Sequence, residues 1–239
     1  MRALIGMAAV AGASVAGASA AQAEVSANVA LTTDYVFRGV SLSDNGPAIQ
    51  GGFDWSSQQL YAGVWGSSVS EGVELVAYGG LTPTTGAVEW DLGAIGYFFP
   101  GADDDAAELD YVEYLLGARL PFAERFAIGA ALYYAPDNYS DTGEASYYEL
   151  SAEYAPVEAL LFSAAYGNQS IEDPDGLPGG AGEDDYSSWN LGATYAIHGF
   201  TLDLRYHDTD IDPGSDIAFY TDGPASYDAA FVFSIGREL

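Results

Sequence analysis

Apolar and polar residues alternate along most of the chain with a period of two. Near the N-terminal end, Val25, Ala27, Val29 and Leu31 are separated by polar or small residues. Because successive side chains of a β-strand point to opposite faces, this period predicts strands with one apolar and one polar face. Twelve such segments follow one another, at about 25–41, 48–56, 60–69, 73–81, 87–98, 110–120, 126–135, 145–154, 160–169, 186–196, 200–208 and 226–236. The sequence therefore predicts an all-β protein of about twelve strands.

The connections between these segments alternate in length. Short ones follow every second strand, at Ser57–Gln59, Thr82–Gly86, Pro121–Arg125, Ala155–Ala159 and Ile197–Gly199. Long ones lie between them, at about 99–109, 136–144, 170–185 and 209–225. Short turns at one end and long loops at the other are typical of outer-membrane barrels. Ser70–Gly72 is an exception to this rule, and Ser41–Pro47 is predicted to be a tight turn, with Asn45-Gly46 supplying the positive φ.

The two faces of the strands favour a membrane barrel over a soluble β-sandwich. The apolar faces carry tyrosine and tryptophan towards the strand ends, as in an interfacial aromatic girdle. The polar faces repeatedly place a charge in mid-strand, at Asp34, Glu74, Asp91, Glu113, Glu149 and Asp203. A water-lined lumen tolerates such charges, whereas the core of a sandwich is apolar. We therefore expect a transmembrane antiparallel up-and-down β-barrel.

The N-terminal residues predict export. Arg2 is followed by an apolar stretch to about Ala20 and by the small-x-small sequence Ala21-Gln22-Ala23, which is typical of a secretory signal peptide. We expect residues 1–23 to be a signal peptide and 24–239 to be the barrel, located in the outer membrane. No cysteine is present, so neither disulfides nor thiolate metal sites are expected.

The charge balance narrows the possible partners. The chain has 35 acidic and 6 basic residues, and all six basic residues are arginine. This acidity argues against nucleic acid as a partner. The loop regions 99–110, 136–144, 170–185 and 208–225 together hold 19 of the 35 acidic residues. Asp103-Asp104-Asp105 and the spacing Asp208-x-Asp210-x-Asp212 offer carboxylate oxygens that could bind divalent cations weakly, such as Ca²⁺. The alternative is that these loops are simply solvated.

The N-terminal hundred residues resemble a known family. LTTDYVFRGVSLSDNGPAIQGGFDW at 31–55, YAGVWGSSV at 61–69, ELVAYGG at 74–80 and DLGAIGYFFPG at 91–101 are similar to the TorF-type porins of proteobacteria. The resemblance implies an outer-membrane barrel that acts as a porin. It carries no substrate or catalytic motif. Many outer-membrane barrels end in an aromatic residue that the barrel-assembly machinery reads, whereas this chain ends in Leu239.

The candidate functional residues are charged side chains on the polar faces. Arg38 follows Asp34 by four residues and is expected on the same face. One interpretation is a charged constriction that selects solutes, and the alternative is a set of structural ion pairs that fills a narrow barrel. The candidates for lining the lumen are Asp34, Arg38, Glu74, Asp91, Glu113, Glu149, Asp203 and Arg205. His198 and His207 lie in no recognisable nucleophile motif, so neither an enzyme nor a cofactor is expected.

Two functions follow from this sequence. The first is a passive channel for small hydrophilic solutes with a preference for cations, because the acidic mouths repel anions. The second is a closed or plugged barrel with a structural or adhesion role, whose acidic loops contact lipopolysaccharide or other partners through divalent cations. Lumenal packing distinguishes the two, because Tyr97, Tyr133, Tyr147 and the arginines would fill the interior of a plugged barrel.

Overall fold

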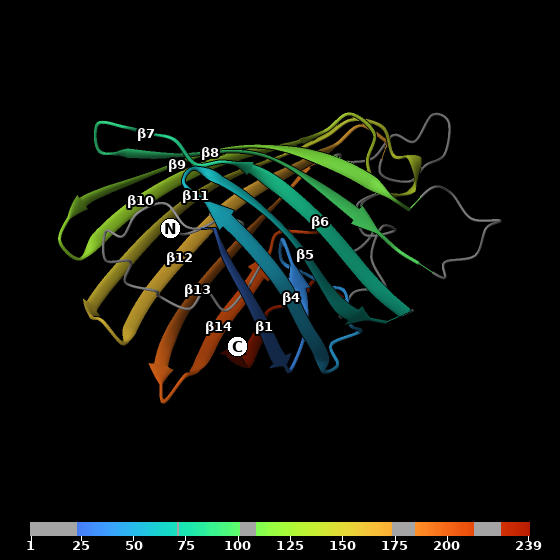
Figure 1. Cartoon of the computed structure of the whole chain (residues 1–239). Helices are drawn as coiled ribbons and strands as arrows, with labels where there is room; N and C mark the ends of the chain where they lie inside the picture. The colour runs from blue at the N-terminus through green and yellow to red at the C-terminus, as the bar shows by residue number, and fades with distance from the viewer. Residues whose placement is uncertain (1–22, 71, 101–108, 174–184, 213–225) are drawn as a thin grey trace.

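Twelve antiparallel strands form a closed barrel (Figure 1). The computed structural model describes residues 23–70, 72–100, 109–173, 185–212 and 226–239, so most of the expected signal peptide lies outside the described residues. The barrel strands are β1 (Glu24–Thr32), β4 (Ala48–Ser57), β5 (Leu60–Val69), β6 (Gly72–Leu81), β8 (Val88–Phe98), β9 (Tyr111–Ala123), β10 (Phe126–Ala135), β11 (Ala145–Val157), β12 (Leu160–Ile171), β13 (Asp185–Ile197), β14 (Phe200–Thr209) and β15 (Ala230–Glu238). The ring closes because β1 pairs with both β4 and β15, and β6 pairs with β8.

Three further strands are two residues long: β2 (Val36–Phe37), β3 (Val40–Ser41) and β7 (Thr84–Thr85). A 3-10 turn, η1 (Tyr139–Asp141), lies between β10 and β11. In the part of the chain that the structure describes, no helix is long and apolar enough to cross a membrane. The prediction of an all-β barrel of about twelve strands is confirmed.

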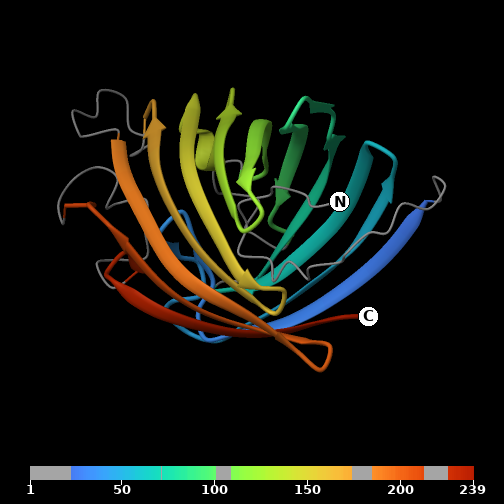
Figure 2. The same cartoon turned by 90° about the vertical axis from the view of Figure 1, so that its left-hand side faces the viewer.

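The connections separate into two ends of the barrel (Figures 1 and 2). One end, here called the turn end, carries the short connections β4–β5, β9–β10, β11–β12 and β13–β14. The opposite end, the loop end, carries the long connections after β8, β10, β12 and β14. Because β1 begins and β15 finishes at the turn end, the first and last strands lie side by side in the same ladder. The predicted alternation of short and long connections is confirmed.

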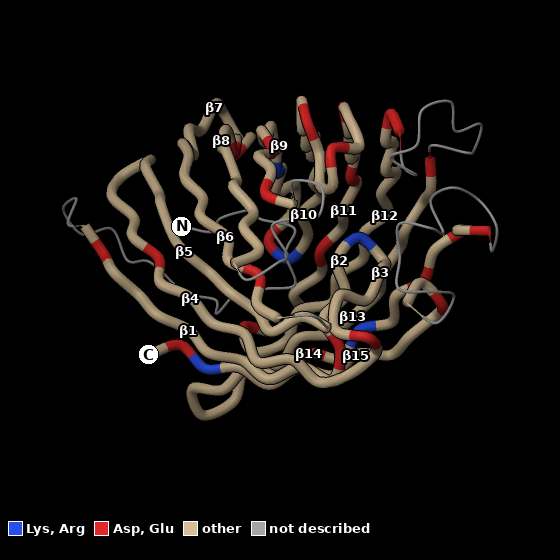
Figure 3. The backbone as a smooth tube through the Cα atoms, turned by 90° about the vertical axis from the view of Figure 1, so that its right-hand side faces the viewer, with Lys and Arg blue, Asp and Glu red and all other residues tan. Residues whose placement is uncertain are grey.

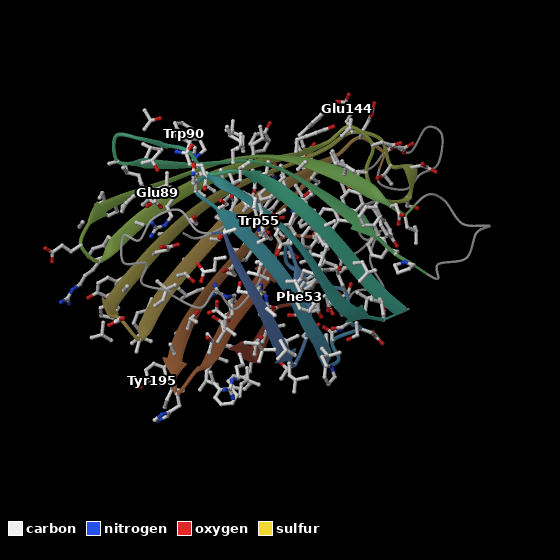
Figure 4. The ribbon with its side chains drawn as sticks, viewed as in Figure 1. Phe53, Trp55, Glu89, Trp90, Glu144 and Tyr195 are labelled. Carbon is white, nitrogen blue, oxygen red and sulfur yellow. The ribbon has the colours of Figure 1, made fainter. Side chains whose placement is uncertain are left out.

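The strands present apolar residues to the outside, whereas their inward faces combine polar side chains with buried apolar ones such as Val76, Ile95 and Leu115. Large apolar side chains stay exposed all round the barrel, including Val64, Leu150 and Leu204. Phe53, Trp55 and Tyr195 are likewise exposed, and Tyr195 lies at the turn end in Figure 4. A soluble protein rarely exposes an apolar surface of this extent, whereas lipid covers it in a membrane barrel.

The stretch from Thr33 to Pro47 corrects the predicted first strand. The strand does not run over 25–41, because β1 ends at Thr32 and the following residues fold into the barrel (Figure 3). We call residues 33–47 the inner hairpin. Within it, β2 pairs with β3. Arg38 and Gly39 both have positive φ, at 49° and 88°, which is the two-residue turn that joins hairpin strands.

The base of the inner hairpin contains the predicted Ser41–Pro47 turn. The Gly46 N–H donates to the Ser43 carbonyl at 2.9 Å. The positive φ values are found at Asp44 and Asn45, both 53°, and not at the glycine. The Ser70 N–H donates to the Leu42 carbonyl at 2.9 Å, so the short β5–β6 connection at the loop end is tied to the hairpin base.

Candidate functional site

Asp34 organises the stem of the inner hairpin. Its carboxylate oxygen Oδ1 accepts a hydrogen bond from the Ser41 hydroxyl at 2.6 Å and lies 2.9 Å from the Ser43 hydroxyl. The Tyr35 N–H donates to Ser43 Oγ at 2.8 Å. Such side-chain bonds to neighbouring residues are typical of turns formed by Asp and Ser. Asp34 was expected on the polar face of the first strand beside Arg38, and this placement is wrong because the strand has already ended.

Arg38 lies at the tip of the inner hairpin and binds the opposite wall. Its Nη1 donates to Glu113 Oε1 and its Nη2 donates to Glu113 Oε2, both at 2.8 Å. Nη1 also donates to Gln169 Oε1 at 2.9 Å. Parallel bonds between a guanidinium and a carboxylate are the strongest class of charge-assisted pair. Arg38 is therefore paired with β9 and β12 and does not lie on the first strand.

Aromatic rings surround this guanidinium. Its central carbon lies 4.3 Å from the ring centroid of Tyr147, 4.7 Å from that of Phe37 and 5.1 Å from that of Tyr133. These distances are within the range of cation–π attraction. The Tyr97 hydroxyl donates to Glu113 Oε2 at 3.1 Å. Tyr97, Tyr133 and Tyr147 are only 2%, 4% and 5% exposed, so tyrosines fill the interior at this level.

The inner hairpin crosses the whole lumen. It leaves the wall between β1 and β4, while Arg38 meets residues of β9 to β12, which include the strands opposite in the ring. On one flank the Tyr35 ring contacts the Trp65 ring with centroids 5.5 Å apart. On the other, a Cβ added at Gly39 would lie 2.4 Å from Thr209 Cγ2. The hairpin is thus held from several sides.

A second polar group lies further along the lumen, on β14 and its neighbours. Arg205 Nη2 is 3.1 Å from Asp203 Oδ2, and its Nη1 donates to Asn190 Oδ1 at 2.7 Å. The Thr194 hydroxyl donates to Asp203 Oδ2 at 2.6 Å. Across the barrel, the hydroxyl of Tyr61 donates to Asp91 at 2.7 Å. Asp203 and Arg205 are thus brought together, whereas Asp91 belongs to a separate contact.

A third group lies near the turn end and includes residues that the sequence analysis did not select. Arg119 donates to Glu89 Oε2 at 3.0 Å and to Glu153 Oε2 at 2.7 Å. Glu89 and Arg119 are direct partners in the β8–β9 register, and Glu89 lies near the turn end in Figure 4. Arg119 shares the face of Glu113 because six residues separate them on β9. This spacing was the signal that would have identified it.

The two remaining candidates also face inward. Glu74 on β6 is 2% exposed, and its Oε2 accepts no hydrogen bond from any residue that the structure describes. Glu149 is partly buried on β11, two residues from Tyr147 and on the same face. The eight candidates therefore do not form one ring. They are distributed over the stem and tip of the inner hairpin and several levels of the wall.

The lumen has an excess of acidic groups. Among the described residues, three arginines face inward: Arg38, Arg119 and Arg205. The acidic residues that face inward or lie in the inner hairpin stem are Asp34, Asp54, Glu74, Glu89, Asp91, Glu113, Glu149, Glu153 and Asp203. Fixed charge of one sign in a cleft with low-dielectric walls concentrates counter-ions. The described inward-facing side chains thus carry more acidic than basic groups.

The candidate divalent-cation residues are only partly described. Asp103-Asp104-Asp105 lies outside the described residues. Asp210 Oδ1 accepts the Ser187 N–H at 2.6 Å, and Asp208 Oδ2 accepts the Tyr206 hydroxyl at 2.8 Å. Within the described ranges, no group of three or more His, Cys, Asp or Glu side chains is placed to hold a metal ion.

Solved structures of outer-membrane proteins are similar to this one. The NanC porin superposes with a TM-score of 0.58 and 10% sequence identity, covering 88% of this chain and 97% of that one. DcaP, an outer-membrane channel of Acinetobacter baumannii, gives a TM-score of 0.45 at 11% identity, covering 92% and 97%. OprD of Pseudomonas aeruginosa, an outer-membrane protein, gives 0.45 at 15% identity, covering 81% and 59%. The likeness to NanC shows a porin-type barrel.

The sequence comparisons place the chain in a family. No curated protein matches it in sequence. The profile of one family matches residues 16–239, and that family is described as "Bacterial protein of unknown function (Gcw_chp)". This description does not support the TorF name, although a porin-type barrel agrees with the resemblance. The chain belongs to the Gcw_chp family of bacterial proteins.

Proposed function

We propose that this protein is a porin-type channel of the outer membrane, which passes small hydrophilic solutes and prefers cations. The observation that carries the proposal is the excess of acidic side chains along an inward-facing polar surface. An acidic lumen attracts cations and repels anions. The apolar exterior and the porin-type fold support a location in the outer membrane.

The inner hairpin sets the width of the proposed passage. Its tip is paired with Glu113 and lies among Phe37, Tyr133 and Tyr147. This packing supports a low conductance in the resting state, because the hairpin tip and buried tyrosines occupy the interior at this level. Displacement of the tip from the wall would widen the lumen. We therefore propose that the hairpin acts as the constriction, and that Arg38 and Glu113 hold it in place.

Planar-bilayer recording tests the channel. With unequal KCl on the two sides, the reversal potential is expected to show a preference for K⁺ over Cl⁻, and this preference should fall as the salt concentration rises. A variant in which residues 35–43 are replaced by a short Gly-Ser linker is expected to conduct more than the wild type. Preference for Cl⁻ in both proteins would contradict the proposed selectivity.

The second candidate is a closed barrel with a structural or adhesion role. The observation that favours it is the packing of Tyr97, Tyr133, Tyr147 and Arg38 in the interior. In this case neither the wild type nor the linker variant conducts. Lipopolysaccharide binding through divalent cations at the acidic loops would then be expected, and its loss on chelation with EDTA would support this role.

Export and assembly are part of both proposals. We propose that residues 1–23 direct secretion and are removed, and that the barrel-assembly machinery inserts the chain. Mass spectrometry is expected to show that the mature protein begins at Glu24. Retention of the N-terminal residues in the membrane-inserted protein would contradict this cleavage site.

A further inference from the structure

The wall of the barrel contains a site that holds a guanidinium group. It consists of Glu113 on β9, Tyr133 on β10, Tyr147 on β11 and Gln169 on β12. In the structure the chain's own Arg38 occupies this site. Glu113 and Gln169 are 1% and 4% exposed. We call these four wall residues the guanidinium cage.

The chemistry of the guanidinium cage is specific for a planar, forked cation. Glu113 accepts two parallel N–H donors, one on each carboxylate oxygen, both at 2.8 Å. Gln169 Oε1 accepts a further N–H. The Tyr147 ring lies 4.3 Å from the guanidinium carbon. An ammonium group is a compact point charge and does not match this bidentate arrangement.

The occupant is held there by a strained tip. Arg38 has φ of 49°, a left-handed conformation that a residue with a Cβ seldom adopts. The inner hairpin presents it to a wall whose nearest cage residue in sequence, Glu113, is 75 positions away. The tip thus brings a guanidinium to a site whose four residues all belong to the wall, as an external ligand would.

We propose that the guanidinium cage is a binding site for a small solute that carries a guanidinium group, and that Arg38 is its internal competitor. A solute that replaces Arg38 at Glu113 releases the hairpin tip from the wall. This inference rests on the proposed channel and names the class of solute that opens it. Because the competing arginine is tethered, its effective concentration is roughly millimolar, so solute at roughly millimolar or higher levels is needed.

Methylguanidinium is the probe for this site. The variant Arg38→Ala vacates the guanidinium cage and is folded in detergent micelles, with folding checked by the heat-dependent shift on a gel. Calorimetric titration is expected to show binding to Arg38→Ala at least about tenfold tighter than to the wild type, whose cage is occupied. Methylammonium, with the same charge but no fork, is expected to bind about tenfold more weakly than methylguanidinium.

Two double variants test whether the Glu113 carboxylate is the group that binds methylguanidinium. Arg38→Ala with Glu113→Gln is expected to lose methylguanidinium binding by at least about tenfold. Arg38→Ala with Glu153→Gln removes the same charge near the turn end, outside the cage, and should bind as tightly as Arg38→Ala. If Arg38→Ala does not fold alone, methylguanidinium is added during refolding instead. Binding is then measured as the amount of protein that regains the heat-shifted folded band on a gel.

The outcomes separate this inference from the channel itself. Absence of binding, equal binding of methylammonium, or binding that survives Glu113→Gln would each overturn the guanidinium site and leave the channel standing. If methylguanidinium binds with the expected specificity but no variant conducts current, the proposed channel is wrong and the proposed guanidinium site stands. A current increase in the wild type on adding methylguanidinium, absent in Glu113→Gln, supports both.

Discussion

Arg38 and Glu113 are joined by two parallel hydrogen bonds of 2.8 Å, although 75 residues separate them in the sequence. Both side chains are nearly inaccessible to solvent. Each charge has therefore left water, and each depends on the other for compensation. Removing one partner leaves a buried charge unpaired, which costs far more than an exposed ion pair contributes.

Arg38→Ala is expected to lower the free energy of unfolding by about 3–5 kcal/mol. The double variant Arg38→Leu with Glu113→Leu should lose less, because it buries no unpaired charge. Urea unfolding midpoints in micelles, measured through the heat-shifted band, compare the proteins. A double variant at least as unstable as Arg38→Ala would show that the pair contributes by more than mutual neutralisation.

The close approach of the hairpin tip to the wall predicts a large effect at Gly39. Gly39→Ala places a Cβ 2.4 Å from Thr209 Cγ2 at a residue with φ of 88°, so we expect a loss of about 2–4 kcal/mol. Gly86 is the matched control, since it also has positive φ but nothing lies within 4 Å of an added Cβ. Gly86→Ala is expected to cost only about 1 kcal/mol. Equal losses at the two positions would argue against the close contact.

Neighbouring residues on β11 test which face meets lipid. Leu150 points outward, whereas Ser151 faces the lumen between Glu149 and Glu153 and opposite Gly129. Leu150→Arg should destabilise the barrel in liposomes by about 2–4 kcal/mol. Ser151→Arg should cost much less, because Gly129 leaves room and the new charge lies between two carboxylates. A reversed order would mean that the faces are assigned the wrong way round.

Folding itself should require an amphiphile. In micelles the wild type is expected to run at different apparent masses when heated and unheated, because a closed barrel has no unpaired strand edge and resists SDS. In plain buffer it should not reach this state, since its exposed apolar surface would remain in water. Cooperative folding in buffer, together with the absence of any heat-dependent shift, would overturn the membrane assignment.

The barrel strands were predictable because successive side chains face lipid and the interior in turn, which gives the sequence a two-residue period. Even the least regular segment, 60–69, forms β5 with Tyr61 and Trp65 inward. The first strand was predicted too long, because the inner hairpin continues the same alternation past Thr32. The predicted segment of 17 residues exceeded the roughly 9 to 11 that cross a bilayer, and Arg38-Gly39 near its C-terminal end marked the turn.

The site was less predictable, because its contacts join strands far apart in the sequence. Asp203 and Arg205 were predictable as neighbours, since alternate residues of one strand share a face. The pairing of Arg38 with Glu113 depends on the path of the hairpin across the lumen, which no local pattern specifies. Gln169 lacked a charge to single it out, and it is recognisable only once Arg38 is seen to reach β12.

The inner hairpin also constrains the order in which the molecule is assembled. It follows the first barrel strand, yet Arg38 binds Glu113 and Gln169, which are made 75 and 131 residues later. Arg38 can contact both residues only when β9 and β12 are part of the same wall, with β10 and β11 between them. The pairing of Arg38 is therefore expected late in folding, after the opposite wall from β9 to β12 has formed. Because Gln169 lies on β12, the full set of Arg38 contacts requires a wall built at least as far as that strand.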